Sequence, residues 1–198
     1  MKTYQKLACA ILLVLLTTVA AVSQHEHSDK GQKPHSHAEM KDAPYDLQFI
    51  DTMSMHHQHG IDMAKLAVSK AHNAELRELA GKMVSDQQKD IAMMKGWRDQ
   101  WYPKRPKAMN MQMPGMSHSS HEEMMKKMSE HMSKLKKASG HEFDMAFIEM
   151  IIPHHQTGIE MSRDALQKAE HSELKAFAQK TIDEQQKDID HLNRLKSQ

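Results

Sequence analysis

The stretch Phe49–Met63, which reads FIDTMSMHHQHGIDM, decides the fold because it returns as FIEMIIPHHQTGIEM at residues 147–161. The offset between the two copies is constant (154 − 56 = 98). It persists downstream, where QQKDI at residues 87–91 returns without a gap at 185–189. A duplication this regular predicts that two copies of one unit build the protein.

Each unit is predicted to form two helices. In the first copy, residues 49, 53, 56, 60, 63 and 67 follow spacings of three or four, which line one face of a helix. A second helix is expected from about residue 74 to 101, after a break at His72 and Asn73 that Glu170 and His171 match in the second copy. A helical hairpin cannot bury its apolar face alone, so the two hairpins should pair into an all-α, four-helix bundle. The repeats are placed at 45–102 and 141–198.

The segment at 103–140 between the repeats is expected to be a methionine-rich linker followed by an extra helix. Ser120 and Glu123 resemble a capping box for a helix over about 122–138, and Gly140 is a natural stop for it. This helix is predicted to lie against the bundle.

The first 23 residues are typical of a signal peptide. Lys2 and Lys6 precede the apolar run Leu7–Val22, which is too short for a spanning helix, and cleavage is expected after Ala21 or Ser23. The pattern predicts export to the periplasm or secretion, with no membrane anchor left after cleavage. The chain's one cysteine lies in this leader, so the mature chain would have neither disulfides nor thiolate metal ligands.

Histidine and methionine are unusually abundant, with 16 His and 19 Met in 198 residues. The formal charge of +1 is spread along the chain and does not indicate a nucleic-acid surface. Residues 24–44 lack apolar periodicity and are expected to be a disordered tail; its histidines could scavenge metal ions or simply be solvated: His25, His27, His35 and His37.

The duplicated His-His pairs are the strongest candidate ligands. His56 and His154 should share a helix stripe with Met63 and Met161 respectively, whereas the second histidine of each pair lies about 100° around the helix. A lone histidine on an apolar face is usually a hydrogen-bonded core residue. Retaining two polar rings in each hairpin is hard to explain by packing and favours metal binding.

Polar residues on the return helices are expected to support these histidines. Gln87 and Gln185 lie in the middle of the inner stripes, with Asp90 and Asp188 three residues later. Amides and carboxylates in such places orient metal-bound imidazoles, although interhelical hydrogen bonding without metal is an equal alternative.

The linker methionines favour copper over other metals. Met109, Met111, Met113 and Met116 lie in a polar loop and are interpreted as ligands, not as core filling. Soft thioethers favour Cu(I), and imidazole suits both copper oxidation states. His118 and His121 follow and would complete a mixed set. The helical methionines at 124, 128 and 132 are interpreted as ordinary hydrophobic burial.

Residues 45–196 resemble the DUF305 family, on the strength of the two His-His-Gln stretches quoted above and the Met113-Pro114-Gly115-Met116 run. The resemblance implies a ferritin-like four-helix bundle and an exported copper-binding protein, linked to copper tolerance, that uses His and Met ligands. Two departures make the half-sites non-equivalent: the counterpart of Met53 is Ile151, with Met150 beside it, and Ser54-Met55 replaces Ile152-Pro153. His59 occurs only in the first repeat, where Thr157 stands in the second.

The leading hypothesis is therefore a protein that sequesters or transfers copper, with copper ions as ligand and a copper exporter or another periplasmic copper protein as partner. Zinc, nickel or silver binding is the alternative within the same class, and a chaperone-like bundle with incidental His and Met is another. A ferritin-like metal oxidase would need Glu-x-x-His motifs, which the chain lacks, so no enzymatic activity and no organic cofactor are expected. The predicted metal ligands are His56, His57, Met53, Met63, His154, His155, Met150, Met161, Met109, Met111, Met113, Met116, His118 and His121.

Overall fold

The computed structural model describes residues 43–116 and 121–197. The predicted signal peptide, the predicted tail as far as residue 42, and His118 lie outside the described residues. Within the described ranges the protein is all-α and has no strand, as predicted. Its five helices are α2 (Tyr45–Lys70), α3 (Ala74–Trp101), α4 (His121–Lys137), α5 (Gly140–Lys168) and α6 (Ser172–Lys196).

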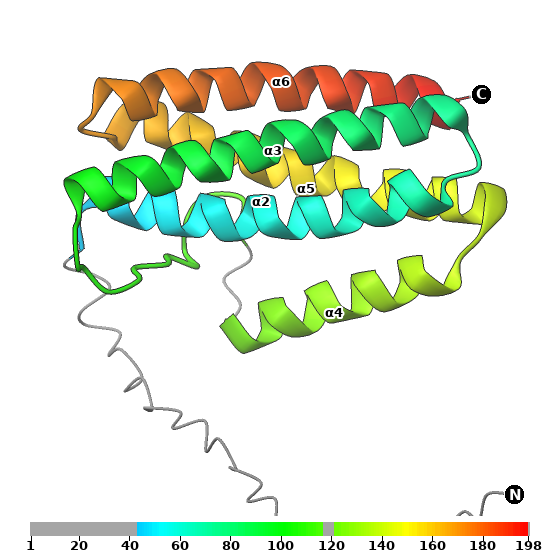
Figure 1. The fold of residues 1–198 in the computed structure, drawn as a ribbon, viewed down its shortest axis with the longest axis horizontal. Coiled ribbons are helices and arrows are strands. Elements are labelled where there is room, and N and C mark those ends of the chain that lie inside the picture. The colour runs from blue at the N-terminus through cyan, green and yellow to red at the C-terminus, as the bar shows by residue number, and fades with distance from the viewer. Residues whose placement is uncertain (1–42, 117–120, 198) are drawn as a thin grey trace, which may run out of the picture. The chain divides into compact units, whose positions relative to one another are not determined.

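The two predicted hairpins form as expected. Helix α2 packs along α3 and helix α5 along α6, and the hairpins meet mainly through α2 and α5 (Figure 1). Helix α3 starts where the sequence predicted, because the side chain of Asn73 accepts hydrogen bonds from the backbone N–H groups of Glu75 and Leu76. None of the helices in the described ranges is long and apolar enough to cross a membrane.

Two repeat-related aspartates tie each hairpin to the turn of the other. The carboxylate of Asp144 accepts hydrogen bonds from the backbone N–H groups of His72 and Asn73, at 2.8 Å each. Asp46, 98 residues earlier, does the same for Glu170 and His171, at 3.0 Å each. Both carboxylates are buried. Unpaired N–H groups near a helix start favour a negative charge, so this exchange stabilises the pairing of the hairpins.

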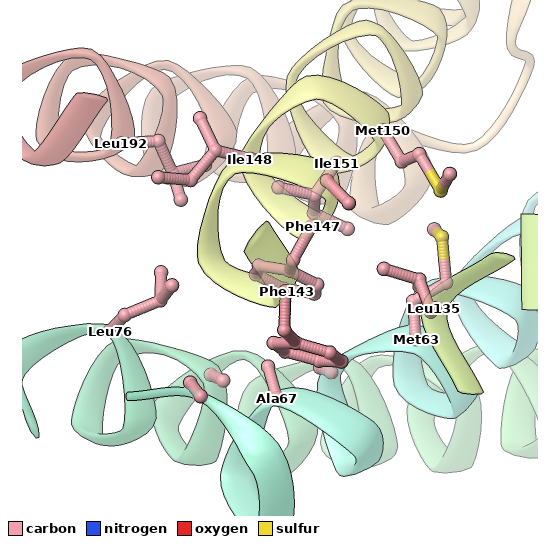
Figure 2. Close-up of a cluster of buried hydrophobic side chains, with 14 of the residues drawn as sticks. Met63, Ala67, Leu76, Leu135, Phe143, Phe147, Ile148, Met150, Ile151 and Leu192 are labelled. Carbon is pink, nitrogen blue, oxygen red and sulfur yellow. The ribbon is translucent and has the colours of Figure 1, made fainter. Parts of the chain in front are cut away.

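The apolar core consists of two clusters. The first contains Met63 of α2, Leu135 of α4 and residues of α5 such as Phe143, Phe147 and Met150. Figure 2 shows Met63, Leu135 and Met150 meeting at one edge of this cluster. The second cluster gathers Phe49, Met53, Met94, Met113, Met161 and Phe177, with other apolar residues packed around them.

Helix α4 is the predicted extra helix, and it contacts α2 and α5 (Figure 1). Buried Leu135 anchors it, and the ammonium group of Lys70 donates hydrogen bonds to the carbonyl oxygens of Leu135 and Lys136. The expected stop at Gly140 was wrong: α4 ends at Lys137, and Gly140 is the first residue of α5. The positive φ of Gly140 (58°), which glycine adopts without steric cost, lets the chain reverse there.

Candidate metal centre

His56 and His154 meet face to face where α2 crosses α5. Their ring centroids are 3.8 Å apart and their planes differ by 16°. Nε2 of His56 lies 3.0 Å from the carbonyl oxygen of His154, and Nε2 of His154 lies 3.2 Å from the carbonyl oxygen of His56. The pairing is thus reciprocal, as the duplication requires, and it joins the two repeats in one place.

These hydrogen bonds define which nitrogen of each ring carries the proton. A carbonyl oxygen can only accept, so Nε2 must donate and the lone pair is left on Nδ1. The Nδ1 atoms of both rings are buried and have no hydrogen-bond partner. Burial lowers the pKa of His56 and of His154 well below that of a free imidazole, and the neighbouring histidines lower it further. Both rings are therefore neutral, which is the form that binds a metal ion.

The second histidine of each pair contacts the predicted aspartate. Nε2 of His57 lies 3.5 Å from a carboxylate oxygen of Asp90, and His155 has the same distance to Asp188. Burial acts to raise the pKa of Asp90, but contacts with His57 and with the Lys180 ammonium outweigh it and hold that pKa below its usual range. The carboxylate is therefore ionised beside His57, an arrangement that orients an imidazole toward a metal ion.

The repeated glycines make room for the glutamine amides of the return helices. A Cβ atom on Gly60 would lie 2.5 Å from Oε1 of Gln87 and 3.0 Å from Cε1 of His154. On Gly158 it would overlap the amide of Gln185. The two glutamines were predicted to accompany the histidines, and each amide lies against the glycine of the His-His-Gln stretch, with the ring of His154 also near Gly60.

These six side chains, His56, His57, Gln87, His154, His155 and Gln185, form what we call the histidine layer. In the described residues, nearly all buried side-chain nitrogen or oxygen atoms without a hydrogen-bond partner belong to this layer; the exceptions are Nε2 of His59 and Oγ of Ser162. An unsatisfied buried polar atom costs about 1–3 kcal/mol, so such a concentration needs a ligand, ordered water or both to offset it.

A cleft between α3 and α6 leads from the surface to the histidine layer. Its cavity volume is about 20 Å³, room for about one water molecule, and its lining includes His57, Gln87 and Gln185. Its acidic lining residues come in repeat-related pairs, one from each return helix: Asp86 with Glu184, and Asp90 with Asp188. Lys82 lines the cleft as well and pairs with Asp86, and Lys180 pairs with Asp90 and Glu184, so these lysines balance part of the negative charge.

The predicted methionine ligands of the helices divide between the two core clusters. Met53 and Met161 lie in one cluster, and Met63 and Met150 lie in the other. Met63 and Met161 are repeat equivalents, yet they lie in different clusters. Each cluster therefore contains one of these methionines from each repeat. Met150 of the second repeat packs with Met63, just as Met53 of the first repeat packs with Met161.

The linker is docked onto the first repeat. Asp51 accepts hydrogen bonds from the backbone N–H of Ala108, at 2.8 Å, and from the Arg98 guanidinium, at 2.6 Å. This docking buries Met113 in the second core cluster and packs Met116 against it. The expectation that the linker methionines do not fill core is therefore wrong for Met113.

The other predicted ligands of the linker differ in how far they are buried and in whether their side chains are described. Met109 and Met111 are half-buried. His121 begins α4, but its side chain is outside the described residues, as is all of His118. Whether any of these residues binds metal stays a prediction.

Two histidines near the layer were missed by the sequence analysis. His59 lies one turn beyond His56 on α2; its ring centroid is 5.2 Å from that of His154 and 6.4 Å from that of His131 on α4. The signal available in the sequence was the replacement of His59 by Thr157 in the second repeat. His131 had none, because its position depends on how α4 docks.

The described side chains contain no group of three His, Cys, Asp or Glu residues already arranged as a metal site. The chemistry of the histidine layer nevertheless fits a soft or borderline metal ion, because neutral imidazoles with free Nδ1 lone pairs are ligands for such ions. A hydrogen bond from one ring nitrogen to a carbonyl oxygen fixes the other nitrogen, here Nδ1, as the one that can bind a metal.

Comparison with known proteins adds independent information. The family model described as "Domain of unknown function (DUF305)" matches residues 46–196. A search of curated proteins finds no match. Among solved structures, CopM with Cu(I) bound is 32% identical, with a TM-score of 0.60, over 76% of this chain and 94% of that one. CopM soaked with silver is 31% identical, with a TM-score of 0.60, over 76% and 93% of the two chains.

A protein from Streptomyces coelicolor that is described as a secreted DUF305 protein is also similar in structure. It is 25% identical, with a TM-score of 0.64, over 76% of this chain and 89% of that chain.

Proposed function

Because this chain belongs to the DUF305 family, whose model spans residues 46–196, we propose that it is an exported protein that binds copper for sequestration or transfer. The similarity to CopM, solved with copper and with silver, supports the choice of metal. The signal-peptide pattern of residues 1–23 supports export to the periplasm. We further propose that α2, α3, α5 and α6 are the ferritin-like four-helix bundle expected from the duplication.

The observation that carries the proposal is the set of buried, unpartnered Nδ1 atoms in the histidine layer. A purely structural histidine would use both ring nitrogens in hydrogen bonds. Here the rings of His56 and His154 use Nε2 and leave Nδ1 free. His57, the neighbour of His56, lines a small cleft together with carboxylates. The cargo would be bound by the four imidazoles of the layer, with the thioethers of Met53, Met63, Met150 and Met161 as the soft ligands nearest along the helices.

The acidic cleft fits delivery of a cation to this layer. Asp86 and Glu184 are partly exposed, whereas Asp90 is buried beside His57. A copper ion entering here would meet carboxylates whose charge Lys82 and Lys180 partly balance, and then the imidazole of His57. We propose a binding protein and not an enzyme, and a copper exporter or another periplasmic copper protein as the partner.

The test replaces the stacked pair by apolar residues in the double variant His56→Leu/His154→Leu. Copper affinity, measured by anaerobic Cu(I) titration against a competing chelator, should fall at least tenfold. Folding stability without metal should stay the same or rise, because two desolvated polar rings are removed. The matched control His141→Gln changes an exposed histidine of α5 and should keep wild-type affinity.

Two results would contradict the proposal. Wild-type Cu(I) affinity in a folded double variant would exclude the stacked pair as ligands. A large loss of stability without metal would show instead that the pair is a structural element of the core.

Silver is the alternative cargo that a specific observation favours, since CopM is solved with silver as well as copper. Silver(I) and Cu(I) share a preference for thioether and imidazole. Zinc and nickel differ in lacking the preference for thioether. Replacing the half-buried Met109 and Met111 together, and leaving the core residues Met113 and Met116 in place, should therefore lower Cu(I) and Ag(I) capacity and leave Zn(II) binding intact. Equal loss of all three metals would contradict thioether selectivity.

A further inference from the structure

His59 and His131 face each other between α2 and α4, away from the cleft. Their ring centroids are 6.4 Å apart and their planes differ by 13°. His59 is 9% exposed, and its Nε2 is buried without a hydrogen-bond partner. His131 is exposed on the surface of α4. One imidazole is thus desolvated and unsatisfied, and the other is open to solvent beside it.

The distance between these rings has room for one ion. Stacked rings lie at 3.8 Å, as His56 and His154 do, so 6.4 Å is too long for direct stacking. A metal ion held between two imidazole nitrogens, with bonds of about 2.0 Å, separates the ring centres by about 6 Å. The observed separation of 6.4 Å accommodates such an ion once the exposed ring of His131 turns a nitrogen toward the unpartnered Nε2 of His59.

Thioethers flank this histidine pair on one side. Helices α2 and α4 run in the same direction, because His59 lies by His131 and the later residue Lys70 reaches Leu135 and Lys136. Met55 precedes His59 by one turn, and Met128 precedes His131 by one turn. Parallel helices place both methionines on the same side of the pair, and both are half-buried.

We propose that His59 and His131 bind one soft monovalent metal ion, Cu(I) or Ag(I), at a second site that links α4 to the core. Met55 and Met128 are its nearest thioethers by helix register. The site takes the metal class of the proposed function but uses none of the residues of the histidine layer. The ring of His154, whose centroid is 5.2 Å from that of His59, connects the two sites and gives an ion a short path from the surface to the layer.

The test measures Ag(I) stoichiometry in the full chain, because silver is stable in air and shares the ligand preference of Cu(I). The variants are His59→Thr, which copies the residue found at position 157, His131→Gln, and the two combined. His141→Gln is the control. Each single variant should bind one Ag(I) fewer than wild type, and the double variant should lose the same single ion, because the two side chains share it.

A second measurement is hydrogen exchange of the amides of α4. Ag(I) should slow their exchange several-fold in wild type and in His141→Gln, and should leave it unchanged in His59→Thr. Wild-type stoichiometry in either single variant, or the loss of two ions in the double variant, would overturn the shared site. So would Zn(II) binding there in preference to Ag(I).

This result is distinguishable from failure of the proposed function. The variant His56→Leu/His154→Leu should keep the ion bound by His59 and His131 and lose the one bound by the histidine layer. If that variant keeps every ion while His59→Thr loses one, the second site stands and the layer does not bind metal. If His59→Thr keeps every ion, the second site is excluded whatever the layer does.

Discussion

The two hairpins of this protein are copies that now differ at most positions, yet several contacts recur in both. Both provide a buried aspartate that caps the turn of the other, Asp46 in the first and Asp144 in the second. Both provide one ring of the stacked histidine pair. They differ at position 59, where the first hairpin has a histidine that faces α4, while the second has Thr157 beside the linker at Gly115.

The contacts between equivalent residues of the two hairpins, at the axis that relates one hairpin to the other, are therefore preserved. The contacts on the outside of the hairpins have diverged. Residues on the axis must match their own copy, so a change in one copy alone breaks a reciprocal contact. Residues away from the axis meet α4 on one side and the linker on the other, and these segments occur once. The two half-sites of the histidine layer also differ, because Lys180 contacts Asp90 at 2.8 Å, whereas Lys82 pairs with Asp86.

The reciprocal aspartate caps give the largest expected effect on stability. Asp46→Ala and Asp144→Ala each remove a buried carboxylate that accepts two backbone hydrogen bonds, and each should lower the free energy of unfolding by about 3 kcal/mol. Asp46→Ala should cost more, because Asp46 also contacts Nδ1 of His171 at 2.7 Å. Urea denaturation of the metal-free protein measures both.

The matched control for these variants is Asp190→Ala, on the exposed side of α6. It should change stability by less than about 0.5 kcal/mol. If the two cap variants were as mild as this control, the exchanged contacts would not hold the hairpins together.

Replacing the repeated glycines should have a smaller effect on stability, and the effect should differ between the two hairpins. Alanine favours a helix by about 1 kcal/mol over glycine. At Gly158 the new Cβ overlaps only the flexible amide of Gln185, so the gain and the loss should nearly cancel. At Gly60 the Cβ also meets the ring of His154 at 3.0 Å, and Gly60→Ala should be destabilising by about 1–2 kcal/mol. Thermal unfolding of the two variants tests the ranking.

The reverse ranking, or equal effects, would show that the two glycines have the same role despite their different neighbours. Gly96→Ala is the control, because no atom lies within 4 Å of its added Cβ, and this variant should be neutral or stabilising.

The smallest expected effect is the pH dependence that His59 adds to the first hairpin alone. Burial, with a further contribution from His131, lowers the pKa of His59 to about 4 from a usual value near 6.5. The unfolded chain then binds a proton that the folded chain does not, so the stabilising contribution is present above about pH 6.5 and is lost as the pH falls toward 4. Because this group is partly exposed, solvent screening should keep the effect to about 1 kcal/mol or less.

His59→Thr should therefore lose less stability than wild type between pH 7 and pH 4, as measured by urea denaturation after removal of metal. His141→Gln, at an exposed position, should follow the wild-type curve. A His59→Thr variant that falls with pH as steeply as wild type would mean that His59 does not resist protonation.

Much of the helix arrangement could be predicted from local signals. The break at His72 and Asn73 was correct because an asparagine cap and the end of the apolar period coincide there. The exchanged caps could not be predicted, since Asp46 and Asp144 look like ordinary polar residues until the two hairpins meet. The interpretation of Met113 was wrong for a similar reason. Asp51 binds the backbone N–H of Ala108 and holds the linker against the bundle, so Met113 is buried in the second cluster although its neighbours in the sequence are polar.

The sequence by itself determined that two hairpins would pair, that His56 and His154 would hold equivalent places, and that glutamines would accompany them. Periodicity and duplication carry this information, because both act through spacing along the chain. The tertiary structure alone sets the stacking of the two rings with Nδ1 left unpartnered, the cleft between α3 and α6 that His57 lines, and the approach of His59 to His131. Those features depend on the crossing of helices far apart in the chain, where the position of one side chain is set by atoms that no local pattern specifies.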